Sequence, residues 1–430
     1  MSGIDYDFLP NPRSDIPGVE IIPTDAPRTP VYQSKLPIEK SFVSRVDPIY
    51  SMSHFESTAL RFRPVEAIRT YNGVLSTNVV GRTDRRYLST MDHAVPDLYS
   101  YHSLLSMAAL NQFHTLTTDQ VSSLLGISTR RAHETLTRLF GAGVLLRAEL
   151  PLISQGSVSN RPGHVWRIAS VTNIRGFVEQ WLDGLTDSEY LLVTDGRDIS
   201  LGVTGSAGQY SFRHNLQMAE TALRLYETSS NVAGILGEQA SALKHLVPED
   251  DKGLSSSQRK KLRRENVGDA AIVGADGRII IFELTAVKNP REVIRTKATY
   301  WTLALSMSKV DFYVVFMNTN PDHDRRTYRK RVLEGIHDMH GRVGSPARMI
   351  RKGQERIFIS DAPTHWFPMS NTVAPGLANL ECYSPASLAY YQLLPDSMKW
   401  NNSAPVINAR GSLTTPRWIT DTPVPLLEKR

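Results

Sequence analysis

Residues 117–139 contain two short helical patterns separated by a turn with a single glycine, Gly126. Thr117 can cap the first helix together with Gln120 three residues later, and Gly126 is expected to end it. Ser128 can cap the second helix. Apolar residues follow at helical spacing in both: Val121, Leu124, Leu125, Ala132, Leu136 and Leu139. The run therefore predicts two helices packed across a tight turn.

The apolar face of the second helix leaves the opposite face exposed. That face carries long donors and an acceptor, which suit base edges and phosphates. The residues expected to contact DNA are Arg130, Arg131, Glu134, Thr137 and Arg138.

Flanking patterns complete this region. An earlier helix is indicated by apolar residues between 104 and 109, and strands are expected at Gly143–Arg147 and His164–Ile168. The loop between the strands contains Arg161, which gives the hairpin a basic tip. Residues 100–170 thus predict a winged helix-turn-helix that binds double-stranded DNA. A helical hairpin packed inside a larger protein, or a winged helix that binds protein, are the alternatives.

The length of 430 residues predicts several segments rather than one domain. They are an extended arm (1–65), a transitional segment (66–99), the winged helix (100–170), a connector (171–210), an α/β domain (211–360) and a Pro-rich tail (361–430). The proline-rich ends could bind a protein partner or a second copy of the chain.

Composition narrows the class of protein. No apolar stretch approaches the roughly 18 residues of a membrane span, and the N-terminus lacks a signal-peptide core, so no membrane partner and a cytoplasmic location are expected. The single cysteine, Cys382, excludes an intramolecular disulfide and a cysteine-based zinc site.

The net charge of +6 favours polyanionic partners. Basic residues concentrate between 258 and 264 and again between 325 and 356. In the first cluster apolar periodicity is absent, so its members are expected to contact DNA phosphates: Arg259, Lys260, Lys261, Arg263 and Arg264.

A second constellation lies between Gly268 and Thr285. An Asp-Gly turn at 276–277 separates two apolar, β-branched runs and predicts a hairpin. Strand parity places Glu283 and Thr285 on one face, with Asp269 at the start of the partnering strand. Two carboxylates that converge in this way can hold a magnesium ion for phosphodiester chemistry. The later run 309–317 predicts a buried central strand.

This stretch resembles the PD-(D/E)XK nuclease core. The resemblance implies metal ligands at Asp269 and Glu283, with a third carboxylate, Glu238, from a preceding helix. Thr285 stands where the motif has its lysine, and Lys297, on an inward stripe with Val293, Tyr300 and Ala304, is the substitute. Glu283 and Lys297 are thus the catalytic pair if the site is active, with magnesium as cofactor. A purely structural ion pair between them is the alternative.

The order of these elements, from the winged helix to a Lys-x-x-Tyr helix, resembles the replication-relaxation family of actinobacterial plasmids and other mobile elements across residues 100 to about 330. The resemblance implies a DNA-binding protein that acts in replication or its control, with a degenerate nuclease-like domain. A magnesium-dependent DNA endonuclease and a structural assembly protein that acts through its termini are the competing hypotheses.

Overall fold

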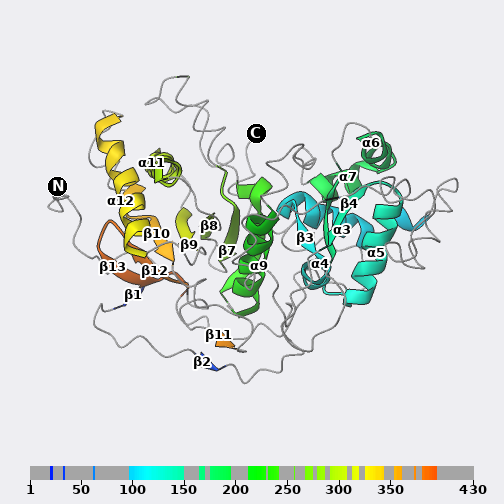
Figure 1. Cartoon of the computed structure of the whole chain (residues 1–430), viewed down its shortest axis with the longest axis horizontal. Coiled ribbons are helices and arrows are strands. Elements are labelled where there is room, and N and C mark those ends of the chain that lie inside the picture. The colour runs from blue at the N-terminus through cyan, green and yellow to red at the C-terminus, as the bar shows by residue number, and fades with distance from the viewer. Residues whose placement is uncertain are drawn as a thin grey trace. The chain divides into compact units, whose positions relative to one another are not determined.

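The computed structural model describes residues 20–22, 32–33, 62, 96–149, 164–169, 175–194, 212–228, 231–241, 256, 267–274, 278–285, 291–307, 312–318, 325–342, 353–360, 372–373 and 380–394. The chain divides into two compact units, which are visible in Figure 1. The helical unit comprises residues 37–223 and 402–422, and the α/β unit comprises 1–36, 224–401 and 423–430. Within the described residues, no helix is both long and apolar enough to span a membrane.

The helical unit combines short helices with a small antiparallel sheet. Its elements are η3 (Pro96–Tyr99), α3 (Tyr101–Phe113), β3 (Leu116–Thr117), α4 (Thr118–Leu125), α5 (Thr129–Gly141), β4 (Leu145–Glu149), β5 (His164–Ile168), α6 (Arg175–Asp183), α7 (Asp187–Thr194) and the first part of α9 (Phe212–Thr228). The strands have the order β3-β5-β4, so β5 is central.

The predicted helix boundaries around α4 are confirmed. The Thr117 hydroxyl accepts a hydrogen bond from the Gln120 amide at 3.1 Å, and the Gln120 Oε1 accepts one from the Thr117 amide at 3.1 Å. Gly126 ends α4 with φ 61°, a left-handed conformation that glycine adopts without steric cost. Ser128 caps α5 by accepting from the Arg131 amide at 3.3 Å.

Gln120 also contacts a second helix. Its Nε2 donates to the Leu216 carbonyl oxygen of α9 at 2.9 Å and to the Glu220 carboxylate at 3.3 Å. Both Gln120 and Glu220 are buried. One side chain therefore completes the cap of α4 and attaches α4 to α9.

The core of the helical unit lies among α3, α4, α5 and the sheet. The predicted apolar positions are buried: Leu104, Leu105, Ala108, Ala109, Val121, Leu124, Leu125, Ala132, Leu136 and Leu139. Trp166 of β5 is fully buried, with its ring 6.1 Å from that of Phe140, and its indole N–H donates to the Thr118 hydroxyl at 2.9 Å. Burial of an indole with its polar atom satisfied stabilises the contact between the sheet and the helices.

The α/β unit is built on a mixed eight-stranded sheet with the order β1-β13-β12-β10-β9-β8-β7-β6. The strands are β1 (Glu20–Ile22), β6 (Val232–Gly237), β7 (Ala270–Gly274), β8 (Ile279–Thr285), β9 (Phe312–Asn318), β10 (Ile357–Ser360), β12 (Glu381–Ser384) and β13 (Ala389–Gln392). β9 pairs in parallel with β8 and with β10, and the other pairs are antiparallel. The remaining short strands, β2 (Tyr32–Gln33) and β11 (Thr372–Val373), pair with each other. The mixed α/β class and the buried central strand β9 are as predicted.

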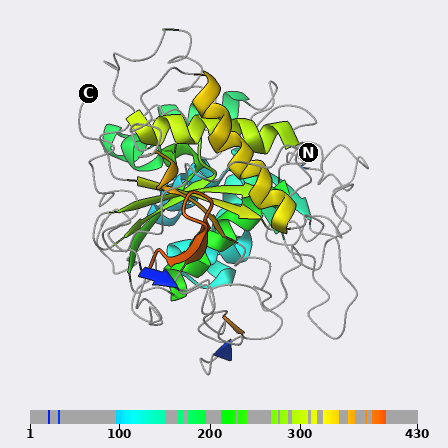
Figure 2. The same cartoon turned by 90° about the vertical axis from the view of Figure 1, so that its left-hand side faces the viewer.

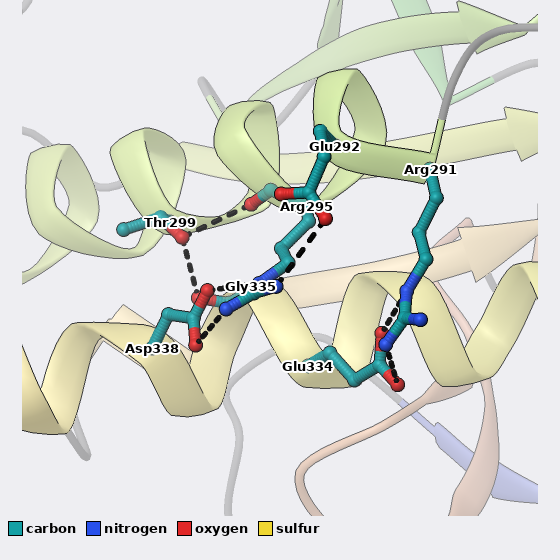
Figure 3. Close-up of polar contacts among 7 residues, drawn as sticks. All are labelled: Arg291, Glu292, Arg295, Thr299, Glu334, Gly335 and Asp338. Carbon is teal, nitrogen blue, oxygen red and sulfur yellow. Dashed lines mark hydrogen bonds and ion pairs between the residues drawn. The ribbon is translucent and has the colours of Figure 1, made fainter.

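Two long helices, α11 (Arg291–Met307) and α12 (Arg325–Arg342), cover one face of this sheet, as Figure 2 shows. A Cβ at Gly335 would lie 2.3 Å from the Arg295 carbonyl oxygen, so only glycine permits this approach of α12 to α11. At the same crossing the Thr299 hydroxyl donates to the Gly335 carbonyl at 2.7 Å. Arg295 binds Asp338, and Arg291 binds both carboxylate oxygens of Glu334, at 2.8 and 3.0 Å (Figure 3).

Several predicted boundaries need correction. The N-terminal arm contributes β1, and the expected C-terminal tail contributes β12 and β13, so the sheet extends beyond residue 360. The preceding helix that was expected to carry Glu238 is instead the end of β6 followed by η4 (Glu238–Ser241), because the edge of β7 takes Ile235 and Leu236 as strand partners. The expected connector contains α6 and α7. Trp181 of α6 stacks on Tyr99 with the ring centroids 5.9 Å apart, and the Asn111 amide of α3 donates to the Val193 carbonyl of α7 at 3.2 Å.

Candidate functional site

The exposed face of α5 begins with two arginines. Arg130 and Arg131 are both exposed, and the Ser128 cap fixes the start of their helix. Arg130 Nε donates to the Glu134 carboxylate at 3.0 Å, one turn further along the helix. Arg138 is half-buried on the same helix. Four of the five residues predicted on this face are therefore accessible to solvent.

The fifth, Thr137, was predicted incorrectly to face outward. It is fully buried, and among the described residues its hydroxyl has no hydrogen-bond partner. The apolar face of α5 is wider than the predicted stripe, since Phe140, three residues further on, is buried as well. Thr137 therefore belongs to the core of the helical unit.

A polar cavity of about 470 Å³ lies between α5 and the beginning of α3. Its lining residues are Ser100, His102, Ser128, Arg130, Arg131, Glu134, Thr135 and Arg138. Burial, and to a smaller extent the charge of Arg131, lowers the pKa of His102. Ser100 and His102 were not predicted as part of a site, because helical periodicity gives no sign of which residues of one helix face another.

The remaining predicted DNA contacts lie outside the described residues. These are Arg161 in the loop between β4 and β5, and the basic cluster Arg259, Lys260, Lys261, Arg263 and Arg264. They stay predictions.

The second candidate site lies under α11, on the face of β8 that carries Glu283. Glu283 is 2% exposed. One of its carboxylate oxygens accepts a hydrogen bond from the Lys297 ammonium group, and the other accepts one from the Trp301 indole at 2.5 Å. Burial raises the pKa of Glu283 to about 7, against the opposing effect of Lys297. The predicted pairing of Glu283 with Lys297 is confirmed.

Asp269 stands close to this pair. Its carboxylate accepts a hydrogen bond from the Leu284 amide at 2.6 Å, which places it at the start of β7 beside the end of β8. The negative charge of Asp269 contributes to the raised pKa of Glu283. Gly268 is required here, because a Cβ would lie 2.2 Å from the Ile281 side chain. The predicted convergence of the two carboxylates is thus found at the β7–β8 hairpin.

Two details of α11 differ from the prediction. Val293 is exposed, and the inward stripe runs instead through Ile294, Ala298 and Trp301. Trp301, and not Tyr300, donates to Glu283. The shift of one residue in the buried stripe explains both, because each residue turns the helix by about 100°. Lys297 lies beside the stripe and reaches Glu283 through its long side chain.

Thr285 is the residue that the resemblance predicts at the position of the motif's lysine. Its hydroxyl is buried and hydrogen-bonded to the Tyr328 hydroxyl of α12 at 3.1 Å. Burial raises the pKa of Tyr328, so the phenol stays neutral. Thr285 and Tyr328 therefore provide neutral hydrogen-bonding groups next to the ion pair.

The predicted set of three metal ligands is not assembled. Glu238 lies at the start of η4, half-buried, directly after β6. Within the part of the chain that the structure describes, no three histidine, cysteine or carboxylate side chains are grouped so that they could hold a metal ion. Asp269 and Glu283 are the two carboxylates that do come together.

Comparisons with protein-family models, with curated proteins and with solved structures give no match.

Proposed function

We propose that the protein binds double-stranded DNA through α5, and that residues 96–168 act as a winged helix-turn-helix. The two short helices α4 and α5 are joined by a turn at Gly126, and the strands β4 and β5 follow them in the chain. In helix-turn-helix proteins this arrangement places the second helix in the major groove. The protein would act in the replication of a mobile element or its control, as the family resemblance implies, in the cytoplasm.

The observation that carries this proposal is the division of α5 into two faces. Leu136 and Leu139 are fully buried, whereas Arg130 and Arg131 are exposed in the first turn. The N-terminal residues of a recognition helix are those that reach base edges. Arginine suits this position because its guanidinium group can bind a guanine through two hydrogen bonds.

The α/β unit is proposed to be a PD-(D/E)XK-like domain that does not cleave DNA. Thr285 cannot supply the cationic group that developing phosphate charge requires. Both oxygens of Glu283 accept hydrogen bonds from α11, so the carboxylate is used within the fold.

The second candidate function is a metal-dependent DNA endonuclease. It is favoured by the proximity of Asp269, Glu283 and Lys297, which interact electrostatically. Asp269 and Glu283 would hold a magnesium ion, which polarises the phosphate and activates water. Lys297 would then have to leave Glu283 and provide the positive charge that Thr285 lacks.

The test of DNA binding begins with selection of bound duplexes from a randomised pool. Replacement of Arg130 and Arg131 by alanine is expected to weaken binding to the selected duplex by roughly 1–3 kcal/mol for each arginine that makes a bidentate base contact. The variant with lysine at both positions keeps the charge but loses bidentate geometry, so it should keep the salt dependence and lose sequence preference. Unchanged affinity in the alanine variant would show that α5 does not contact the DNA.

The test of cleavage uses the same duplex with magnesium or manganese. We expect no cleavage by the wild-type protein. Cleavage that disappears in both Glu283→Gln and Asp269→Asn, while DNA binding persists, would establish the endonuclease instead.

A further inference from the structure

We propose that the cavity between the start of α3 and α5 is a binding site for a phosphate group. The inference rests on the proposed function, because five of the eight lining residues belong to α5, the helix proposed to contact DNA. It adds a ligand class and a second helix, α3, to that surface.

The arginines of α5 line one side of the cavity. Arg131 and Arg138 are seven residues apart, which is two turns of α5, and both line the cavity. The buried Thr135 lies between them on the same side of the helix. The cavity therefore has two guanidinium groups along one wall. Guanidinium groups in this arrangement suit an oxyanion, which can accept hydrogen bonds from both.

The lining of the cavity carries more positive than negative charge. Among the residues that line the cavity, three are arginines and one, Glu134, is a carboxylate. Glu134 binds Arg130 at 3.0 Å, so that pair contributes no net charge. The lining side chains therefore carry a formal excess of two positive charges. A cavity lined in this way attracts an anion.

The beginning of α3 also lines the cavity. Ser100 and His102 line the cavity from the beginning of this 13-residue helix. Helix N-termini carry a partial positive charge and favour anions. The N-terminus of α3 therefore favours an anionic ligand, as the arginines of α5 do. His102 also gives the site an imidazole that the charge of Arg131 already affects.

The size of the cavity sets the form of the ligand. A water molecule takes up about 30 Å³ of the liquid, and the cavity measures about 470 Å³. It can therefore hold a phosphoryl group with part of the molecule that carries it. The carrier is either the DNA backbone or a small phosphorylated molecule, and the phosphoryl group is common to both.

The experiment titrates the full-length protein with inorganic phosphate and follows the His102 imidazole by NMR, with His102→Gln used to assign the signal. We expect saturable binding, with a rise in the pKa of His102 when the anion is bound. Arg131→Gln with Arg138→Gln should weaken phosphate binding by about tenfold or more, because each arginine makes charge-assisted hydrogen bonds. Arg326→Gln with Lys330→Gln is the matched control. It removes the same charge from exposed positions of α12 in the other unit, and phosphate affinity should stay the same.

A second pair of variants tests α3 separately. His102→Glu introduces a carboxylate beside Arg131 and should abolish phosphate binding, whereas the neutral His102→Gln should retain it, as followed by calorimetry. An acidic residue in the first turn is favourable to the helix, so His102→Glu is expected to fold. Phosphate binding that survives in His102→Glu and in the double arginine variant would overturn the proposed site, as would the absence of saturable binding in wild type.

Competition distinguishes the two sources. If phosphate competes with DNA and a single methylphosphonate linkage in the duplex weakens binding, the DNA backbone occupies the cavity. If phosphate binds without affecting DNA affinity, a small phosphorylated molecule is the ligand. Either result supports the site. If phosphate binds while Arg130→Ala with Arg131→Ala leaves DNA affinity unchanged, the proposed recognition helix fails and the phosphate site stands.

Discussion

Glu134 and Glu283 each pair with a basic side chain, and the surroundings of the two pairs differ. In the helical unit, the Arg130 side chain is 88% exposed and its partner Glu134 is 37% exposed. In the α/β unit, the Lys297 side chain is 33% exposed and its partner Glu283 is 3% exposed. The first pair loses little when it separates, because water solvates both charges. The second pair cannot separate without leaving a carboxylate unpaired in the protein interior.

This difference indicates what each pair can do. Arg130 can exchange Glu134 for a base or a phosphate at small cost, which suits a binding surface. Glu283 is fixed by Lys297 and Trp301, which suits a structural role for the ion pair. A residue type therefore says little about function until its solvation is known.

The largest expected effect is that of Lys297→Ala, which leaves Glu283 buried and unpaired. Removal of one partner of a buried pair costs about 3–5 kcal/mol of unfolding free energy, and we expect the lower end because part of Lys297 is exposed. Lys297→Met should cost less, since it refills the volume next to Trp301. Urea denaturation measures both. As the exposed counterpart, Arg130→Ala should cost less than about 1 kcal/mol. Equal losses in the two alanine variants would contradict the comparison.

The next effect is the pH dependence of Lys297→Met. Lys297 acts to lower the pKa of Glu283, so its removal should raise that pKa further above about 7. Between pH 5 and pH 8 the unfolded chain ionises its glutamate, with an ordinary pKa of about 4.3, while the folded protein retains the proton. Stability should therefore fall as pH rises, and the deficit relative to wild type should be about 1–2 kcal/mol larger at pH 8 than at pH 5. Denaturation at both pH values tests this, and a deficit independent of pH would argue against a buried carboxylate.

A smaller effect is expected for Thr137→Val on α5. The substitution removes a buried hydroxyl that has no partner among the described residues, at nearly constant volume. We expect thermal or urea denaturation to show a gain of about 1 kcal/mol, because an unsatisfied buried polar group is destabilising. DNA affinity should be unchanged. Thr129→Val is the contrasting variant, because it removes an exposed hydroxyl that is hydrogen-bonded to Ser122 at 3.5 Å and to the Asp119 carboxylate, so it should lower stability. Weaker DNA binding by Thr137→Val would instead show that Thr137 contributes to the DNA-binding surface.

The smallest effect on stability is expected for Glu134→Gln. The exposed pair with Arg130 contributes about 0.3–0.5 kcal/mol. DNA affinity should increase severalfold at low salt, because a carboxylate is removed from the surface proposed to face phosphates. Binding measured by fluorescence anisotropy over a range of salt concentrations checks this. A decrease in affinity would indicate that Glu134 itself contacts a base.

The parts of the structure that could be predicted from the sequence are those set by residues close together in the chain. Local signals were sufficient for α4 and α5, because Thr117, Gly126 and Ser128 act on residues only a few positions away. The Glu283–Lys297 pair was predictable for a related reason. Strand parity and the demand of a semi-buried lysine for a partner both follow from short stretches of sequence.

The errors arise where distant segments meet. The burial of Thr137 depends on what packs around α5, and the strand β6 exists because β7 offers an edge to Ile235 and Leu236. The lining of the cavity by His102 depends on how α3 crosses α5. Periodicity within one element contains none of this information.

Gln120 limits how the sequence of this protein can vary. Glutamate is the usual alternative to glutamine at the third position of a capping box. Here, however, the Gln120 amide donates to the Leu216 carbonyl and to Glu220, and a carboxylate at this position could do neither. It would also place two negative charges together in the interior. Gln120 is therefore expected to be replaced only together with Glu220, so that the two positions evolve as a pair.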